Sequence, residues 1–429
     1  MLSIVLNSPP RKTSLTILTF GLFAAAIVLV SRWMQPKPAA LKPPPPPQTN
    51  AIPFLDVPPG SLDTFFASLR RTEAKEPGAV TRILHYGDSP TTADSITADV
   101  RRLLQTRFGD AGHGFVLIAK PWAWYGHRGI KLAGSGWRIQ PASQARAKDG
   151  IHGIGGVSFT GETGASSSVT LPDDKYSRVI VYYLAQPEGG DFTVSGAPEE
   201  GDEEKIEDVQ TAGESGKKPA FAEIQLPPGT RTVSLRVTSG SVRLFGYRFD
   251  KEQPGVQYNS LGINGAQVQM ILRAFETTQW TENLRHEDPA LVVLNYGTNE
   301  SIYPRYVDEE YPDELRRVIA AIRTAVPHAS LLLMGPMDRG VANAGGEVST
   351  APTLESLIAV QKRVAAETGC AFFNTFEAMG GAGTMARWYA SRPQLVSADY
   401  THPMPAGAAI VGELFEKALL QAYEQVPQQ

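Results

Sequence analysis

The hydrophobic positions of the chain change their period several times, and these changes divide it into segments. From residue 60 onward, apolar runs of strand length alternate with amphipathic stretches of helical period. Strands are expected at 83–86, 291–294, 330–334 and 371–373, and helices at about 95–108, 313–325, 353–369 and 406–425. This alternation predicts an α/β fold, in which helices cover both faces of a parallel sheet.

Between residues 116 and 253 the pattern is different. Helical periodicity is absent, glycine is frequent, and short β-rich runs follow one another at 156–160, 167–171, 178–184, 191–195, 220–226, 232–238 and 241–249. Closely spaced short strands predict a β-sandwich. Because strands of the α/β pattern occur on both sides, the sandwich is expected as an insertion in the α/β domain. The acidic stretch 199–208 is expected to be a solvated loop of this insert.

An uncharged run from Leu15 to Val30 precedes the body of the chain. With its flanking residues it has about the length of a helix that crosses a bilayer. The alternative is a cleaved signal peptide, whose apolar core is usually shorter. Arg11 and Lys12 favour a cytoplasmic N-terminus, which places the rest of the chain in the periplasm or at the cell exterior. We therefore expect a single-pass transmembrane anchor within residues 1–34.

Residues 35–59 contain ten prolines, five of them in the run Pro43–Pro47. Such a run forms a semi-rigid polyproline II spacer, although it could alternatively be a ligand for a proline-binding domain. The expected organisation is therefore an anchor, a linker, an α/β domain in two parts and an insert between them, at residues 1–34, 35–59, 60–115 with 254–429, and 116–253.

Composition and charge exclude several classes of protein. The chain has 429 residues, of which 40 are basic and 44 acidic, so its net charge is −4. A chain with this balance lacks the positive field of a nucleic-acid-binding protein. Cys370 is the only cysteine, which excludes an intrachain disulfide and a cysteine-based zinc site, and the seven histidines contain no HExxH pair. No metal and no organic cofactor are expected.

Ser89 is the candidate nucleophile, because Gly87-Asp88-Ser89 directly follows an apolar strand. In α/β folds, nucleophiles are exposed at the carboxyl ends of strands. An attacking serine needs a general base, and the base needs an orienting group. His402 is the candidate base, and Asp399, three residues earlier, is the candidate carboxylate. Each motif alone is weak evidence, but together they indicate a Ser–His–Asp triad.

Ester cleavage through a tetrahedral intermediate also requires hydrogen-bond donors for the oxyanion. The Ser89 backbone N–H is one candidate. Gly265 follows another short strand, and a glycine N–H can approach a substrate closely. Asn299 offers a side-chain amide in the loop after the 291–294 strand. The alternatives are an ordinary tight turn at Gly265 and a helix cap at Asn299.

The order of these blocks resembles that of the SGNH hydrolase superfamily, also called GDSL esterases. The four blocks are Gly87-Asp88-Ser89, Gly265, Gly297-Thr298-Asn299-Glu300 and Asp399-Tyr400-Thr401-His402. The resemblance covers residues 82–423 apart from the insert, and it implies a three-layer, flavodoxin-like parallel sheet. It further implies a catalytic triad of Ser89, His402 and Asp399, and oxyanion donors at Ser89, Gly265 and Asn299.

Residues 87–115 and 259–267 are similar to the peptidoglycan O-acetylesterase branch, in which a carbohydrate-binding-like β module follows the first block. That branch commonly has histidine after the nucleophile, whereas this chain has Pro90, which stiffens the turn and removes a donor. The resemblance implies an esterase that removes O-acyl groups, acetyl above all, from an envelope glycan, and the expected anchor would attach this esterase to the membrane. An O-acyltransferase with the same triad and an inactive glycan-binding protein remain alternatives.

Several other residues have two interpretations. The aromatic residues near the start of the insert predict either a sugar-stacking platform or a core, of which the core is the more common; they are Trp122, Trp124, Tyr125 and Trp137. The remaining polar candidates are expected to be structural: His113 and His127 as hydrogen-bonded loop residues, His85 within its strand, and Glu300 as the cap of the following turn.

Overall fold

The computed structural model describes residues 54–144, 147–214 and 216–425. The predicted transmembrane segment and most of the proline-rich linker lie outside these ranges, so the anchor stays a prediction. Within the described ranges, none of the helices combines the length and the apolar character that a membrane span requires.

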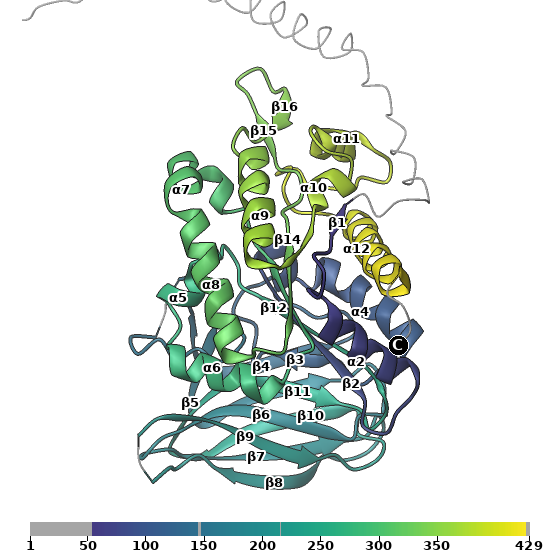
Figure 1. The fold of residues 1–429 in the computed structure, drawn as a ribbon. Helices are drawn as coiled ribbons and strands as arrows, with labels where there is room; N and C mark the ends of the chain where they lie inside the picture. The colour runs from purple at the N-terminus through teal and green to yellow at the C-terminus, as the bar shows by residue number, and fades with distance from the viewer. Residues whose placement is uncertain (1–53, 145–146, 215, 426–429) are drawn as a thin grey trace, which may run out of the picture. The chain divides into compact units, whose positions relative to one another are not determined.

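A six-stranded sheet forms the centre of the α/β part (Figure 1). Its order is β1 (Leu55–Asp56), β17 (Ala371–Phe373), β14 (Ser330–Met334), β13 (Leu291–Asn295), β2 (Val80–Gly87) and β12 (Gly255–Gly262). The five strands from β17 to β12 are parallel, and only the short edge strand β1 is antiparallel. The predicted α/β fold is therefore confirmed.

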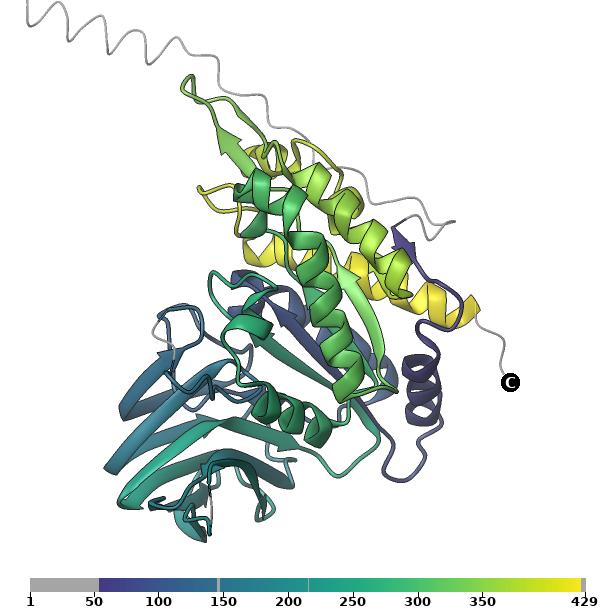
Figure 2. The same cartoon turned by 60° about the vertical axis from the view of Figure 1, so that its left-hand side comes forward.

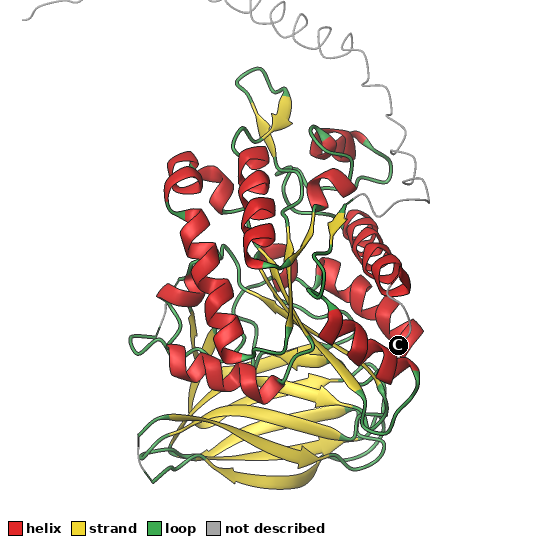
Figure 3. Cartoon of the chain, viewed as in Figure 1, coloured by secondary structure: helices red, strands yellow, loops and turns green. Residues whose placement is uncertain are grey.

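Helices cover both faces of this sheet (Figures 1 and 3). One layer contains α2 (Asp63–Glu73), α4 (Ser95–Phe108) and α12 (Pro405–Gln425), and the other contains α6 (Thr277–Glu287), α8 (Tyr311–Ala325) and α9 (Leu354–Thr368). Successive residues of a strand point to opposite faces, so Val293 packs with Val100 and Phe415 in one hydrophobic cluster. Its neighbour Val292 belongs to the other cluster, with Val318.

Short elements connect these layers. They are α3 (Ser89–Thr92), α5 (Met270–Arg273), η1 (Glu300–Ile302), α7 (Pro304–Glu309), the hairpin of β15 (Gly340–Ala342) and β16 (Val348–Thr350), α10 (Thr375–Ala378) and α11 (Thr384–Ala390). The loops and short helices after β2, β12 and β13 carry the first three blocks of the candidate site.

The insert forms a second, nine-stranded network at one end of the central sheet (Figures 2 and 3). Its strands are β3 (Gly114–Val116), β4 (Lys131–Pro141), β5 (Val157–Thr170), β6 (Arg178–Ala185), β7 (Asp191–Ala197), β8 (Glu204–Gln210), β9 (Lys218–Gln225), β10 (Thr232–Ser239) and β11 (Ser241–Asp250). All pairings are antiparallel. The entering strand β3 pairs with the leaving strand β11, so the two ends of the insert lie together. The boundaries of a separate module stay a prediction.

The structure corrects two details of the predicted insert. One long strand, β5, replaces the two short strands expected at 156–160 and 167–171. The acidic stretch 199–208 is not a loop throughout, because its second half belongs to β8, which pairs with β7 at the end of the network. Only Val209 of β8 is buried. An edge strand of this kind carries charged side chains in solvent, so its composition resembles that of a loop.

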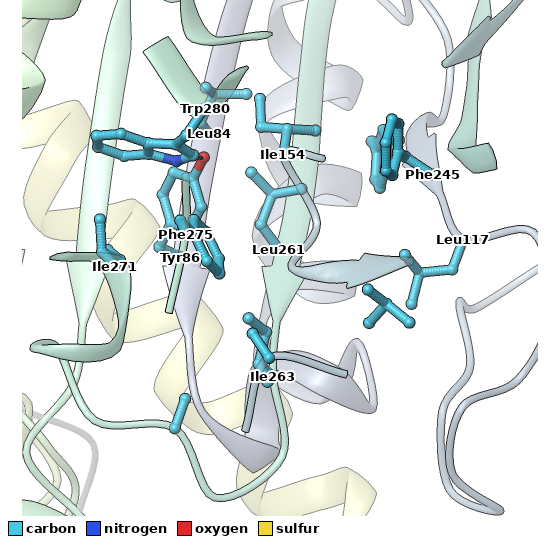
Figure 4. Packing of buried hydrophobic residues seen from close by; sticks show 14 of the residues in the cluster. Leu84, Tyr86, Leu117, Ile154, Phe245, Leu261, Ile263, Ile271, Phe275 and Trp280 are labelled. Carbon is cyan, nitrogen blue, oxygen red and sulfur yellow. Dashed lines mark hydrogen bonds between the residues drawn. The ribbon is translucent and has the colours of Figure 1, made fainter. Parts of the chain in front are cut away.

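The insert and the central sheet share one hydrophobic core (Figure 4). Leu84 of β2 and Leu261 of β12 belong to the same cluster as Leu117, Ile154 and Phe245, which come from the insert. The strands that lead to Ser89 and to Gly265, β2 and β12, are therefore packed against the insert.

Candidate active site

Ser89 lies at the start of α3, directly after β2. The register of the sheet places Gly262, the last residue of β12, opposite Gly87, the last residue of β2. A Cβ atom on Gly262 would lie 2.0 Å from the Thr92 backbone nitrogen, and one on Gly87 would lie 2.2 Å from Thr91 Oγ1. These two glycines therefore allow the helix that begins with Ser89 to pack against the strand ends.

The structure brings together the three residues of the predicted triad. Ser89 Oγ lies 2.7 Å from His402 Nε2, although the two residues are 313 positions apart. His402 Nδ1 lies 2.6 Å from Asp399 Oδ2. An ionised carboxylate can only accept, so Nδ1 carries the proton of a neutral imidazole, and Nε2 is then free to accept the Ser89 hydroxyl proton. This is the arrangement that activates a serine.

Asp399 is held in place by several donors besides the imidazole. Its Oδ1 accepts hydrogen bonds from Ser397 Oγ at 2.5 Å, from the Thr401 N–H at 2.9 Å and from the His402 N–H at 3.0 Å. Partial burial raises the pKa of Asp399, but these hydrogen bonds and the one to the imidazole outweigh it and hold the pKa well below its ordinary value. The carboxylate therefore stays ionised, and it fixes the orientation of His402.

The predicted oxyanion donors gather at the same edge of the sheet. Ser89 N–H belongs to the first turn of α3, and Gly265, at φ +69°, is exposed in the loop after β12. Neither N–H donates to an acceptor in the part of the chain that the structure describes. Asn299 Nδ2 lies 2.9 Å from the carbonyl oxygen of Ala266, which joins the two donor loops. Asn299 occupies the position before η1 but makes no side-chain cap.

Glu300 has a different role from the turn cap that the sequence predicts. Its side chain is buried, Oε1 accepts the Val268 N–H at 2.7 Å, and Oε2 accepts the Gly297 N–H at 3.0 Å. Burial raises the pKa of Glu300 to about 8, although the two hydrogen bonds act to lower it. Burial also raises the pKa of Asp88, to about 6, while the Thr298 hydrogen bond and the nearby His402 oppose the rise. Asp88 and Glu300 are thus two buried acids beside the triad and the oxyanion loops. The sequence motif indicates that acidic residues occupy these positions, but not that they are buried.

Asp94, His113 and His127 form a buried cluster with ligand-type atoms within 4.8 Å of one another. Both oxygens of Asp94 already accept from the Arg101 guanidinium, at 3.1 and 2.6 Å, and His113 Nε2 lies 3.0 Å from His127 Nδ1. Burial lowers the pKa of both histidines, that of His127 to about 4, so the pair is neutral. With its carboxylate neutralised by arginine, the cluster fits a structural network better than a cation site.

His85, which the sequence places within its strand, is likewise buried, and its Nδ1 lies 2.7 Å from the hydroxyl of Tyr258.

Comparisons with known proteins find one family model and several solved structures. The GDSL-like Lipase/Acylhydrolase family model matches residues 230–410, which include Gly265, Asn299, Asp399 and His402. No curated protein matches the chain in sequence. A solved structure described as a peptidoglycan O-acetylesterase in action is 22% identical, covers 87% of this chain and 99% of its own, and has a TM-score of 0.72.

Two further solved structures match only part of the chain. An acetyl xylan esterase is 12% identical and covers 37% of this chain and 79% of its own, with a TM-score of 0.30. A phospholipase A1 from Streptomyces albidoflavus is 17% identical and covers 38% and 80%, with the same TM-score. The GDSL-like match over residues 230–410, the order of the blocks and the hydrogen-bonded triad together support a serine esterase of the SGNH (GDSL) type, and the O-acetylesterase structure shares the fold of this chain.

Proposed function

We propose that the protein removes O-acetyl groups from an envelope glycan, with peptidoglycan as the first candidate. The observation that carries the proposal is the hydrogen-bonded series Ser89–His402–Asp399, with 47% of the His402 side chain and 51% of the Asp399 side chain exposed. A triad open to solvent suits an ester on a long polymer, which could not enter a closed pocket. The overall fold likeness to a peptidoglycan O-acetylesterase supports the choice of glycan.

The proposed mechanism transfers the acyl group to water. His402 Nε2 takes the hydroxyl proton of Ser89 as Oγ attacks the ester carbonyl, and the Ser89 N–H, the Gly265 N–H and the Asn299 amide receive the oxyanion. The intermediate collapses, the C–O bond to the sugar breaks, and His402 returns the proton to the leaving sugar oxygen. A water molecule then gives a proton to His402 and attacks the acetyl-serine, which releases acetate and regenerates the Ser89 hydroxyl.

We also propose that residues 1–34 attach the enzyme to the membrane, with the catalytic body outside the cytoplasm. The support is the apolar run and the basic residues before it. Residues 35–53 of the linker would reach up to about 60 Å if they were fully in polyproline II conformation, at about 3.1 Å per residue. Such a spacer would give a membrane-attached esterase access to a polymer layer at some distance from the bilayer.

The test is acetate release by the full-length protein in detergent, from O-acetylated peptidoglycan and from acetylated xylan. Ser89→Ala should lower the turnover of peptidoglycan by about 10⁴-fold or more. Ser356→Ala, at an exposed position on α9, is the matched control and should keep full activity.

Each outcome separates one part of the proposal. Ser89-dependent release from peptidoglycan supports the proposal, whereas release from xylan alone would show that peptidoglycan is not the substrate. Cleavage of p-nitrophenyl acetate without release from either polymer would support esterase activity but contradict the proposed glycan substrate. Acetyl groups recovered on an added oligosaccharide, in place of free acetate, would make the protein a transferase.

A further inference from the structure

We propose that Trp124 is a sugar-stacking residue, which orients the acetylated glycan over the catalytic serine. The inference rests on the proposed function. Trp124 lies in the loop between β3 and β4, at the start of the insert. Its neighbours Trp122 and Tyr125 are buried, at 7% and 4% exposure, so they form the core that the sequence predicts for such a cluster. Trp124 is 54% exposed, the largest value among the exposed large hydrophobic residues of the described ranges.

The loop that carries Trp124 is firmly attached to the segment after the nucleophile. The hydroxyl of Tyr125 accepts the Leu117 N–H at 2.8 Å and lies 3.0 Å from His127 Nε2. The Arg128 N–H donates to Asp94 Oδ2 at 3.0 Å, and the Arg128 guanidinium donates to both oxygens of Asp99, at 2.7 and 3.0 Å.

Asp94 directly precedes α4, and α4 follows the short helix of Ser89. These hydrogen bonds hold the residues that follow Trp124 in the loop, so the loop should lose little conformational entropy when a ligand contacts it.

The indole also contacts the segment that carries a predicted oxyanion donor. Trp124 Nε1 donates to Asn264 Oδ1 at 3.3 Å, and Asn264 immediately precedes Gly265. Because Gly262 pairs with Gly87, Asn264 and Ser89 each lie two residues beyond paired strand ends. The exposed indole is thus at the same edge of the sheet as the nucleophile.

The same loop reaches the segment of the catalytic histidine. Gly126, His127 and Arg128 line a cavity of about 490 Å³ together with Pro403, the residue after His402. The Trp124 loop therefore lies between the oxyanion segment and the histidine segment, where a sugar that carries the scissile ester would pass.

The chemistry of an indole at this position fits a pyranose ring. The face of the ring system is apolar with a negative quadrupole, so it attracts the weakly positive C–H groups on one face of a sugar. The sugar hydroxyls lie around the edge of the pyranose ring and remain free to meet polar groups. Burial of the exposed indole under a sugar would also remove apolar surface from water. A small ester without a sugar gains nothing from this contact, so the effect depends on the substrate.

The test compares wild type with Trp124→Ala and Trp124→Phe on two substrates, O-acetylated peptidoglycan and p-nitrophenyl acetate. Trp124→Ala should lower kcat/KM for peptidoglycan by about 10- to 100-fold, chiefly by raising KM, as the truncation of a central aromatic contact does. It should leave kcat/KM for p-nitrophenyl acetate within about twofold. Trp124→Phe keeps an aromatic face and should recover most of the lost activity. Trp124→Leu is the control for side-chain size: it should not recover the activity, whereas an effect of bulk alone would let it do so.

The outcomes distinguish this inference from the proposed function. Ser89-dependent release that Trp124→Ala leaves unchanged would overturn the stacking role and leave the esterase function intact. An equal loss on both substrates would show that Trp124 supports the site structurally and would also overturn the inference.

If the wild type releases no acetate from peptidoglycan, co-sedimentation with the insoluble polymer tests the contact without catalysis. Ser89→Ala should then sediment with peptidoglycan more strongly than the double variant Ser89→Ala/Trp124→Ala. Equal sedimentation of the two proteins would overturn the inference.

Discussion

The carboxyl group of Glu300 accepts the backbone N–H of Val268 at 2.7 Å, and this bond joins the two loops that carry the proposed oxyanion donors Gly265 and Asn299. The other carboxyl oxygen accepts the Gly297 N–H, so one buried side chain holds both loops. An oxyanion site works because its donors are positioned before the reaction. We therefore assign Glu300 a positioning role, and not a contact with the substrate.

Glu300 should make the stability of the protein depend on pH. Its pKa is raised by burial from 4.5 to about 8, so the folded protein keeps a proton that the unfolded chain loses. The free energy of unfolding should fall as the pH rises from about 4.5 to about 8, by at most about 1.4 kcal/mol per pH unit for one group.

Asp88, with a pKa of about 6, adds a change of the same sign at lower pH. Urea denaturation at pH 6, 7 and 8 should therefore give a flatter dependence for Glu300→Gln than for wild type. Glu355→Gln, an exposed change on α9, is the control and should follow wild type. Parallel slopes for wild type and Glu300→Gln would contradict the prediction.

Asp399→Asn should lower kcat by about 10³- to 10⁴-fold with a small change in KM. Asparagine is neutral and cannot stabilise the imidazolium that forms when His402 accepts the serine proton. Its amide can also donate to Nδ1 and favour the wrong tautomer. Because hydrogen bonds hold the pKa of Asp399 well below its ordinary value, the deficit should be similar at pH 6 and pH 9. Steady-state kinetics at both values checks this, and a deficit confined to one of them would count against the assignment.

Asn299→Ala should lower kcat by about 10²- to 10³-fold, which is the usual cost of one oxyanion donor. The side chain is already oriented by its bond to the Ala266 carbonyl, so the loss should be in kcat and not in the binding of the ground state. Asn343→Ala, in the exposed β15–β16 hairpin, is a suitable control. Equal activity of the two variants on p-nitrophenyl acetate would remove Asn299 from the site.

Gly262→Ala should reduce both stability and activity. The added Cβ would lie 2.0 Å from the Thr92 backbone nitrogen, so α3 must move, and overpacking of this kind typically costs about 1–3 kcal/mol. The displacement would also move Ser89 relative to His402. Gly213→Ala, where the nearest atom would be 3.5 Å away, should be close to neutral. Denaturation curves and kcat for both variants measure the difference, and an unaffected Gly262→Ala would show that the helix adapts.

The sequence indicates the three residues that the structure brings together because Ser89 follows a strongly apolar strand and Asp399 and His402 share one short motif. It predicts the central strands for the same reason: Leu291–Asn295 and Ser330–Met334 are almost wholly apolar. It misses β4, whose residues are mostly exposed and show no regular apolar alternation. It also misses the bond from Glu300 to Val268, because only the tertiary fold brings these two loops together.

The aromatic cluster of the insert shows the same limit. The sequence allows a sugar platform or a core for Trp122, Trp124 and Tyr125, and the structure buries Trp122 and Tyr125 but leaves Trp124 exposed. Burial of neighbouring residues in a loop depends on which way each side chain points, and no periodicity predicts that.

The pairing of β3 with β11 has a consequence for how the chain folds. β2 and β12 are neighbours in the central sheet, yet the bonded residues Arg82 and Gln257 are 175 positions apart, which is a costly loop to close. Once the strands of the insert have formed, Gly114 and Phe249 lie opposite each other, and the effective loop shrinks to the 32 positions from Arg82 to Gly114 and the eight from Phe249 to Gln257. We therefore expect a substitution that weakens the pairing of β3 with β11 to delay the appearance of esterase activity during refolding, even where the final enzyme is unchanged.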